Sequence, residues 1–204
     1  MIRHIWFDFG DTIGSINKDA HDKLRYNFYA SATGRTVSPE LIKEFEELYQ
    51  RHERSNSAVF RSLGLPSKYW SEQVNSLDPA KFCRLANDNI PQVLDALRKM
   101  VPISTFSNLE LEKVFQELGV DPKWFSHFLN AGMVKEPKPA LDGFYKMIEL
   151  SQLPPNEILY IGDDVGKDIL PTKKAGIGTG LMWKRSGQAD YCFEKFDEVL
   201  DVVR

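Results

Sequence analysis

The apolar positions at the start of the chain form one short run. Residues 2–7 are apolar apart from Arg3 and His4, and the run ends at Asp8 and a glycine turn. Such a run, rich in β-branched and aromatic residues, is typical of a strand that helices cover on both faces of a parallel sheet. Because chemistry in such folds lies at the carboxyl ends of the strands, Asp8 is a candidate reactive group. Asp is also common in turns for purely local reasons.

The next segment has a different pattern, because from residue 17 to residue 89 the apolar positions recur at helical spacing without a convincing strand. A first helix is expected to end by Gly34, and Ser38 with Pro39 provides the N-cap and first turn of a second. Shorter helices are expected at 57–63, around Trp70 and from Asp78-Pro79. We interpret residues 17–89 as a small inserted α-helical domain whose many aromatic residues form its core.

From residue 90 onward, helical and strand patterns alternate. Short apolar runs predict strands at 101–106, 127–129, 158–161 and 181–183. Helical spacing predicts helices at 91–100, at 111–118, around Phe144 and Met147, and at 196–203. Such alternation is typical of an α/β fold with a doubly wound parallel sheet. The sequence therefore predicts a core domain from residues 1–16 and 90–204, with the helical domain of residues 17–89 inserted after the first strand.

Composition narrows the functional classes. The 204 residues, 42% hydrophobic and 27% charged, are typical of a globular protein large enough for a core with an insertion. The net charge of -3 disfavours a nucleic-acid partner, and Cys83 and Cys192 stand too far apart to indicate a disulfide framework or a zinc site. With no leader segment and no apolar run near the ~18 residues of a membrane span, we expect a cytoplasmic protein without a membrane partner. The oligomeric state is open.

Polar side chains recur where the predicted strands end. They are Asp8, Ser107, Lys138, Asp163, Asp164 and Asp168. Each has a local explanation, as a helix cap, a loop cation or a turn residue. Because the carboxyl ends of parallel strands meet at one edge of the sheet, the sequence predicts that these side chains share a site.

Such a site suits transfer of an anionic group to Asp8, since a carboxylate can form a covalent intermediate that water later cleaves. Carboxylates around one point repel unless a cation lies between them, and hard oxygen ligands suit Mg²⁺. Lys138 and the Ser107 hydroxyl could hold the transferring oxygens by charge and hydrogen bonds. The expected substrate is a phosphate compound.

Four segments in order carry a resemblance to a known family. They read Asp8-Phe9-Gly10-Asp11-Thr12, Phe106-Ser107-Asn108, Lys138-Pro139-Ala140-Leu141-Asp142-Gly143-Phe144 and Ile161-Gly162-Asp163-Asp164-Val165-Gly166-Lys167-Asp168. Each is weak alone, but four at suitable spacing cover nearly all of the core. The chain resembles the haloacid dehalogenase-like hydrolase superfamily, which implies a Rossmann-like core and, for residues 17–89, the family's helical cap that closes over substrate.

The resemblance implies a role for each matching residue. Asp8 resembles the nucleophile, and Lys138 the charge-balancing lysine, which its sequence context favours over Lys135. Ser107, with Asn108 beside it, resembles the phosphate-binding group. The implied Mg²⁺ site is formed by Asp8, the Gly10 carbonyl, Asp163, Asp164 and Asp168, the last also supporting the lysine.

One position departs from the family's phosphatases, which have a second aspartate two residues after the nucleophile as general acid and base. Gly10 stands there, and Asp11 follows one residue later. Successive side chains point in different directions, so Asp11 does not simply take over. Only proton transfer is affected, since the resemblance implies that the metal contact at this position is made by the backbone carbonyl. General acid-base transfer is typically worth ~10² to 10⁴ in rate.

Three interpretations remain. The first is a Mg²⁺-dependent phosphatase of a small phosphorylated metabolite, with a good leaving group, a cap residue or Asp11 compensating for the missing acid. The second is a 2-haloacid dehalogenase, with Arg35 as the candidate for binding a substrate carboxylate. The third is a non-catalytic phosphate-binding protein. The resemblance favours the phosphatase, because dehalogenases of this superfamily work without metal and typically replace Asp163 and Asp164 by serines.

Overall fold

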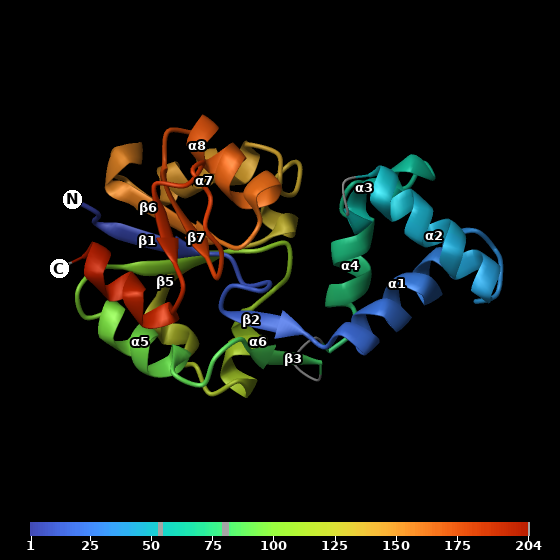
Figure 1. Cartoon of the computed structure of the whole chain (residues 1–204), viewed down its shortest axis with the longest axis horizontal. Coiled ribbons are helices and arrows are strands. Elements are labelled where there is room, and N and C mark those ends of the chain that lie inside the picture. The colour runs from blue at the N-terminus through green and yellow to red at the C-terminus, as the bar shows by residue number, and fades with distance from the viewer. Residues whose placement is uncertain (53–54, 79–81, 204) are drawn as a thin grey trace.

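The computed structural model describes residues 1–52, 55–78 and 82–203, and Figure 1 shows an α/β part and a helical part side by side. Within the described residues, six strands form one parallel sheet in the order β5-β4-β1-β6-β7-β8. The strands are β1 (His4–Phe7), β4 (Ile103–Phe106), β5 (Phe125–Leu129), β6 (Ile158–Gly162), β7 (Gly178–Met182) and β8 (Tyr191–Phe193). β1 therefore lies inside the sheet, with β4 and β6 as its neighbours.

Helices cover both faces of this sheet. One face packs against α5 (Ile90–Leu97), α6 (Glu112–Glu117) and the 3₁₀ helix η6 (Phe196–Val202). The other packs against α7 (Asp142–Ser151), with the π-helical turn η5 (Val165–Ile169) and α8 (Leu170–Lys174) on the same side of the sheet in Figure 1. Side chains of β1 alternate between the faces, as the pleat requires, so Phe7 packs with Phe196 while Trp6 belongs to the opposite cluster. The predicted doubly wound α/β fold is confirmed.

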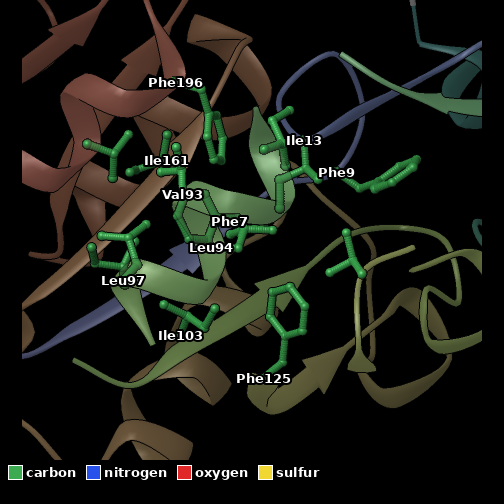
Figure 2. Packing of buried hydrophobic residues seen from close by; sticks show 14 of the residues in the cluster. Phe7, Phe9, Ile13, Val93, Leu94, Leu97, Ile103, Phe125, Ile161 and Phe196 are labelled. Carbon is green, nitrogen blue, oxygen red and sulfur yellow. The ribbon is translucent and has the colours of Figure 1, made fainter. Parts of the chain in front are cut away.

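Figure 2 shows how the first of these clusters fills the space beside β1. Phe7, Leu94, Leu97 and Ile103 gather from two strands and α5, and each is fully buried. This packing fixes the end of β1, and with it the loop that follows, relative to the neighbouring strands.

The helical part has a hydrophobic core of its own. It contains α1 (Lys18–Ala32), α2 (Pro39–Arg51), α3 (Asn56–Ser62) and α4 (Tyr69–Asn75). Phe45, Phe60 and Trp70 are buried together there, as expected for core aromatics. The Ser38 hydroxyl accepts the Leu41 N–H at 3.3 Å, which confirms the predicted N-cap, and Gly34 follows α1 with a left-handed φ of 66°.

One prediction about this region needs correction. The structure contains an antiparallel ribbon of β2 (Gly14–Ile16), which was not predicted, and β3 (Cys83–Leu85), which lies in residues 17–89, where no strand was expected. Strands of three residues are too short for alternation to stand out from a helical background. The expected segment from Asp78-Pro79 falls largely on residues 79–81, which lie outside the described residues, and the domain boundaries around residues 17 and 89 stay predictions.

The remaining differences concern the ends of elements. The helix predicted over residues 91–100 ends at Leu97, and Met100 beyond it is 44% exposed. β8 was not predicted, and three 3₁₀ turns complete the described elements: η2 (Pro122–Trp124), η3 (Ala131–Met133) and η4 (Pro155–Glu157). Among the helices that the structure describes, none is both long and apolar enough to cross a membrane.

Candidate active site

The loops at the carboxyl edge of the sheet surround a cavity of about 450 Å³. Asp8 follows β1, Ser107 follows β4, and Asp163 follows β6, so the pairing of these strands brings the three side chains together. Lys138 enters the same cavity from the loop between β5 and α7. The predicted convergence of the strand-end residues is therefore observed.

Lys138 is the central hydrogen-bond donor of the site. Its ammonium donates to Asp8 Oδ1 at 2.7 Å, to Asp168 Oδ1 at 2.8 Å and to the Tyr160 hydroxyl at 2.7 Å. Burial alone would lower the pKa of Lys138, but the charges of Asp168 and Asp8 raise it above its usual range. Lys138 therefore stays charged in the buried site. Lys135, its rival in the sequence, is exposed.

Asp8 and Asp163 are carboxylates whose charge is poorly compensated. Burial raises the pKa of Asp8 to about 7, against the opposing charge of Lys138 and with a further rise from Asp168. Burial, then the charge of Asp168, raises the pKa of Asp163 to about 6, against the opposing charge of Lys184. A second cation beside these groups would favour their ionised forms.

The geometry fits a hard divalent cation. One carboxylate oxygen each from Asp8, Asp163 and Asp168 lies within 4.8 Å of the others, and these are the ligand atoms that Mg²⁺ takes in proteins. Asp168 is 1% exposed and already accepts from Lys138, Tyr160 and the Asp164 N–H. Asp168 thus orients its neighbours, while Asp8 and Asp163 have oxygens with fewer protein partners.

Asp164 has a local role that accounts for its position. Its Oδ1 accepts from the N–H groups of Gly166 and Lys167 at 2.8 and 2.9 Å, which caps the turn of η5. It borders the cavity but lies outside the Asp8–Asp163–Asp168 cluster. Its predicted role as a metal ligand stays a prediction, beside the capping role that the structure shows.

The two residues after β4 divide their roles. Ser107 is 4% exposed, lines the cavity and accepts the Leu109 N–H at 3.3 Å, so its hydroxyl proton is available to a bound anion. Asn108 also lines the cavity, and its side-chain oxygen accepts the Lys138 N–H at 3.2 Å. Asn108 therefore holds the loop that delivers the lysine.

Gly10 and Asp11 lie on the loop after Asp8. A Cβ added at Gly10 would meet only Asp8 Oδ2, at an ordinary contact distance of 3.6 Å, so the backbone here has space for a Cβ. Asp11 has a left-handed φ of 51°, its carbonyl accepts from Trp183 Nε1 at 2.8 Å, and its exposed side chain borders the cavity. Asp11 is therefore near the site, as predicted, while its catalytic role stays a prediction.

Sequence reasoning missed several residues of the site. Tyr160 lies within an apolar strand, where a tyrosine gives no signal beyond core packing, yet its hydroxyl joins Lys138 to Asp168. Lys184 ion-pairs with Asp163 from the loop after β7, and Tyr49 borders the cavity from α2. Such contacts depend on tertiary placement that a single sequence does not carry.

The family model for haloacid dehalogenase-like hydrolase matches residues 2–176. The chain belongs to this family. A curated relative, the haloacid dehalogenase-like hydrolase domain-containing protein 3 of Xenopus laevis, is 22% identical, and the match covers 89% of this chain and 84% of the relative. The resemblance seen in the sequence is thus confirmed.

Solved structures of similar fold include proteins of different activities. A HAD-hydrolase from Bacillus subtilis bound to magnesium has a TM-score of 0.65 and 16% identity, covering 100% of this chain and 99% of that one. A HAD phosphatase from Thermococcus onnurineus has a TM-score of 0.69 and 16% identity, covering 98% and 97%. A 2-haloacid dehalogenase from Pseudomonas syringae has a TM-score of 0.66 and 14% identity, covering 99% and 98%. At these identities the likeness shows the fold alone, so the chemistry must be argued from the site.

Proposed function

We propose that this hydrolase is a Mg²⁺-dependent phosphatase that acts on a small phosphorylated metabolite through a covalent intermediate on Asp8. The observation that carries the proposal is the cluster of the Asp8, Asp163 and Asp168 carboxylates, in which Lys138 pairs with Asp8 and Asp168. Lys138 between Asp8 and Asp168, and the partly exposed Lys184 beside Asp163, leave room for a divalent cation among the three carboxylates and for an anionic substrate.

The residues divide the reaction between them. Asp8 attacks phosphorus, the bond to the leaving oxygen breaks, and an aspartyl phosphate forms. Water then attacks the same phosphorus, which releases inorganic phosphate and restores the Asp8 carboxylate. Lys138 and the Ser107 hydroxyl stabilise the transferring oxygens. Mg²⁺, held by Asp8, Asp163 and the Gly10 carbonyl, would supply charge neutralisation between carboxylates and phosphate.

Proton transfer to the leaving group is the step that Gly10 leaves open. Asp11 borders the cavity and is one candidate for it; a residue of the helical part is another. A substrate with a good leaving group needs neither, because the departing oxygen carries its charge without a proton.

The helical part is proposed as the cap that selects the substrate and excludes water. Tyr49 of α2 borders the Asp8 cavity, and a second cavity of about 410 Å³ lies between His52, Arg61 and the loop around Lys138. Both cavities combine residues of the two parts, so a substrate bound to Asp8 would also face the helical part. A small phosphorylated molecule in the cytoplasm is the proposed partner.

The dehalogenase alternative is less well supported by the geometry. Arg35, its candidate for binding a substrate carboxylate, is paired with Glu44 at 3.0 Å and is not among the residues that line the Asp8 cavity. The Asp163 and Asp168 carboxylates also remain beside Asp8, where a metal-free reaction would leave their charge against the nucleophile.

Turnover of an aryl phosphate tests the proposal. We expect phosphate release that rises with Mg²⁺ and is abolished by a chelator and by Asp8→Asn. Asp197→Asn, an exposed position on η6, serves as the matched control and should retain full rate. A parallel assay with 2-chloropropionate follows chloride release. Metal-independent turnover, turnover unchanged in Asp8→Asn, or chloride release without phosphate release would each refute the phosphatase; binding of phosphate without any turnover would favour the non-catalytic interpretation.

A further inference from the structure

Lys184 contacts Asp163 in two ways. Its ammonium donates to the Asp163 backbone oxygen at 2.9 Å and to Asp163 Oδ2 at 3.2 Å. The contact arises from the sheet, because β7 pairs with β6 and the loops that follow the two strands lie next to each other. Lys184 thus holds the carboxylate that the proposed metal site would use.

The backbone at Trp183 directs Lys184 toward the site. Trp183 has a φ of 64°, in the left-handed region that a bulky residue rarely adopts, so the chain turns sharply at the end of β7. Two hydrogen bonds hold this conformation: the Trp183 N–H donates to the Phe193 oxygen at 2.7 Å, and its ring N–H donates to the Asp11 oxygen at 2.8 Å. Because both the backbone and the ring of Trp183 are held by hydrogen bonds, the backbone position of the next residue, Lys184, is well defined.

Lys184 differs from Lys138 in how firmly it is held. The Lys138 side chain is 6% exposed and contacts both Asp8 and Asp168, whereas the Lys184 side chain is 57% exposed and pairs with Asp163, itself 20% exposed. A partly exposed ion pair of this kind is weak, so another cation can displace the lysine from Asp163. The cavity that Lys184 borders leaves its side chain room to move.

We infer that Lys184 is an internal counter-ion that competes with Mg²⁺ for Asp163 and thereby weakens metal binding. The inference rests on the proposed magnesium site. With the lysine in place, the metal-free protein keeps Asp163 paired and oriented. Binding of Mg²⁺ then has to displace the ammonium from Asp163 Oδ2. The protein therefore binds Mg²⁺ more weakly than the same carboxylates would without Lys184.

Calorimetric titration of Mg²⁺ into the whole protein, without substrate, tests this competition. Lys184→Met removes the charge and keeps much of the side-chain length. We expect it to tighten Mg²⁺ binding about 3- to 10-fold, because it removes both a weak ion pair with Asp163 and the repulsion between the ammonium and the metal. Lys184→Arg keeps the charge and should stay near the wild type. Lys174→Met, an exposed lysine at the end of α8, should leave the affinity unchanged.

Salt dependence separates charge competition from packing. The affinity ratio between Lys184→Met and wild type should shrink when ionic strength rises from about 0.05 M to about 0.5 M, because screening weakens exposed charge interactions. Equal or weaker Mg²⁺ binding by Lys184→Met, or a ratio that salt does not change, would overturn the inference. If neither protein binds Mg²⁺, the inference and the magnesium site fail together. Tighter binding by the variant without phosphatase turnover would refute the proposed function alone.

Discussion

Gly10 is the residue at which the site can be completed by one substitution. Gly10→Asp places a carboxyl where only Asp8 Oδ2 would meet its Cβ, so the fold should accept it. We expect turnover of alkyl phosphates, whose leaving oxygens need a proton, to rise about 10²-fold or more, the low end of what general acid catalysis supplies. Turnover of an aryl phosphate with a good leaving group should change little. Rates across a series of leaving groups check this.

Gly10→Asn is the matched control, because it has a similar shape and no transferable carboxyl proton. It should leave the leaving-group dependence as in the wild type. Equal acceleration of alkyl and aryl phosphates, or equal behaviour of the two variants, would show that Gly10→Asp acts through something other than proton transfer.

At the same scale, the sequence predicted the residues that strand ends bring together and missed those that tertiary packing adds. Asp8, Ser107, Lys138 and Asp163 follow from the rule that the carboxyl ends of parallel strands share an edge. Tyr160 is indistinguishable from a core aromatic until the loop carrying Lys138 is placed beside it. The capping role of Asp164 could be recognised only in the structure, because an Asp before a helical turn in the sequence fits a cap and a metal ligand equally well.

At the scale of elements, a buried histidine joins β1 to β4. His4 Nε2 lies 2.9 Å from the Ser104 hydroxyl, which itself accepts the His127 N–H, so that hydroxyl can donate its proton to a neutral His4. Burial, with a smaller effect of His127, lowers the pKa of His4 from 6.5 to about 4. Protonation therefore favours the unfolded chain, and stability is fully present above pH 6.5 and is lost as the pH falls toward 4.

The buried His4 predicts that the stability of the fold falls in acid, and that one substitution removes this part of the fall. Between pH 7.5 and pH 5.0 the wild type should lose about 2 kcal/mol of unfolding free energy through His4. His4→Gln, which cannot be protonated, should be spared that part of the loss. Urea unfolding at both pH values measures the difference. Equal losses in the two proteins would mean that His4 is protonated in the folded state as easily as in the unfolded chain.

The first turn of α7 packs on β4 through a glycine. A Cβ at Gly143 would overlap the ring of Phe106, a fully buried residue that stacks edge-on with Phe144. Gly→Ala in a helix normally stabilises by up to about 1 kcal/mol, but overpacking costs ~1 to 3 kcal/mol, so Gly143→Ala should be net destabilising in urea unfolding. Gly187→Ala, with nothing within 4 Å, should change stability by less than about 0.5 kcal/mol. A stabilised Gly143→Ala protein would contradict this packing.

At the scale of the whole molecule, the order of helices and strands in the α/β part followed from periodicity, but the edge strand β8 did not. β8 is a three-residue strand whose place is fixed by pairing with β7, a contact that no local pattern encodes. The same holds for β2 and β3, each of which is stable only through its partner. Hydrophobic periodicity thus identified the helices and strands that bury one face. It did not identify the short strands that are held only by hydrogen bonds to a neighbouring strand.

The β2–β3 ribbon also bears on how such a protein can change over evolution. Gly14 pairs with Leu85 and Ile16 with Cys83, so the chain leaves for α1 and returns after α4 at almost the same point. Because the cost of closing a loop grows only slowly with its length, helices can be gained, lost or exchanged beyond this ribbon with little effect on the sheet. The reactive carboxylates and the structure that faces the substrate are therefore free to diverge at different rates.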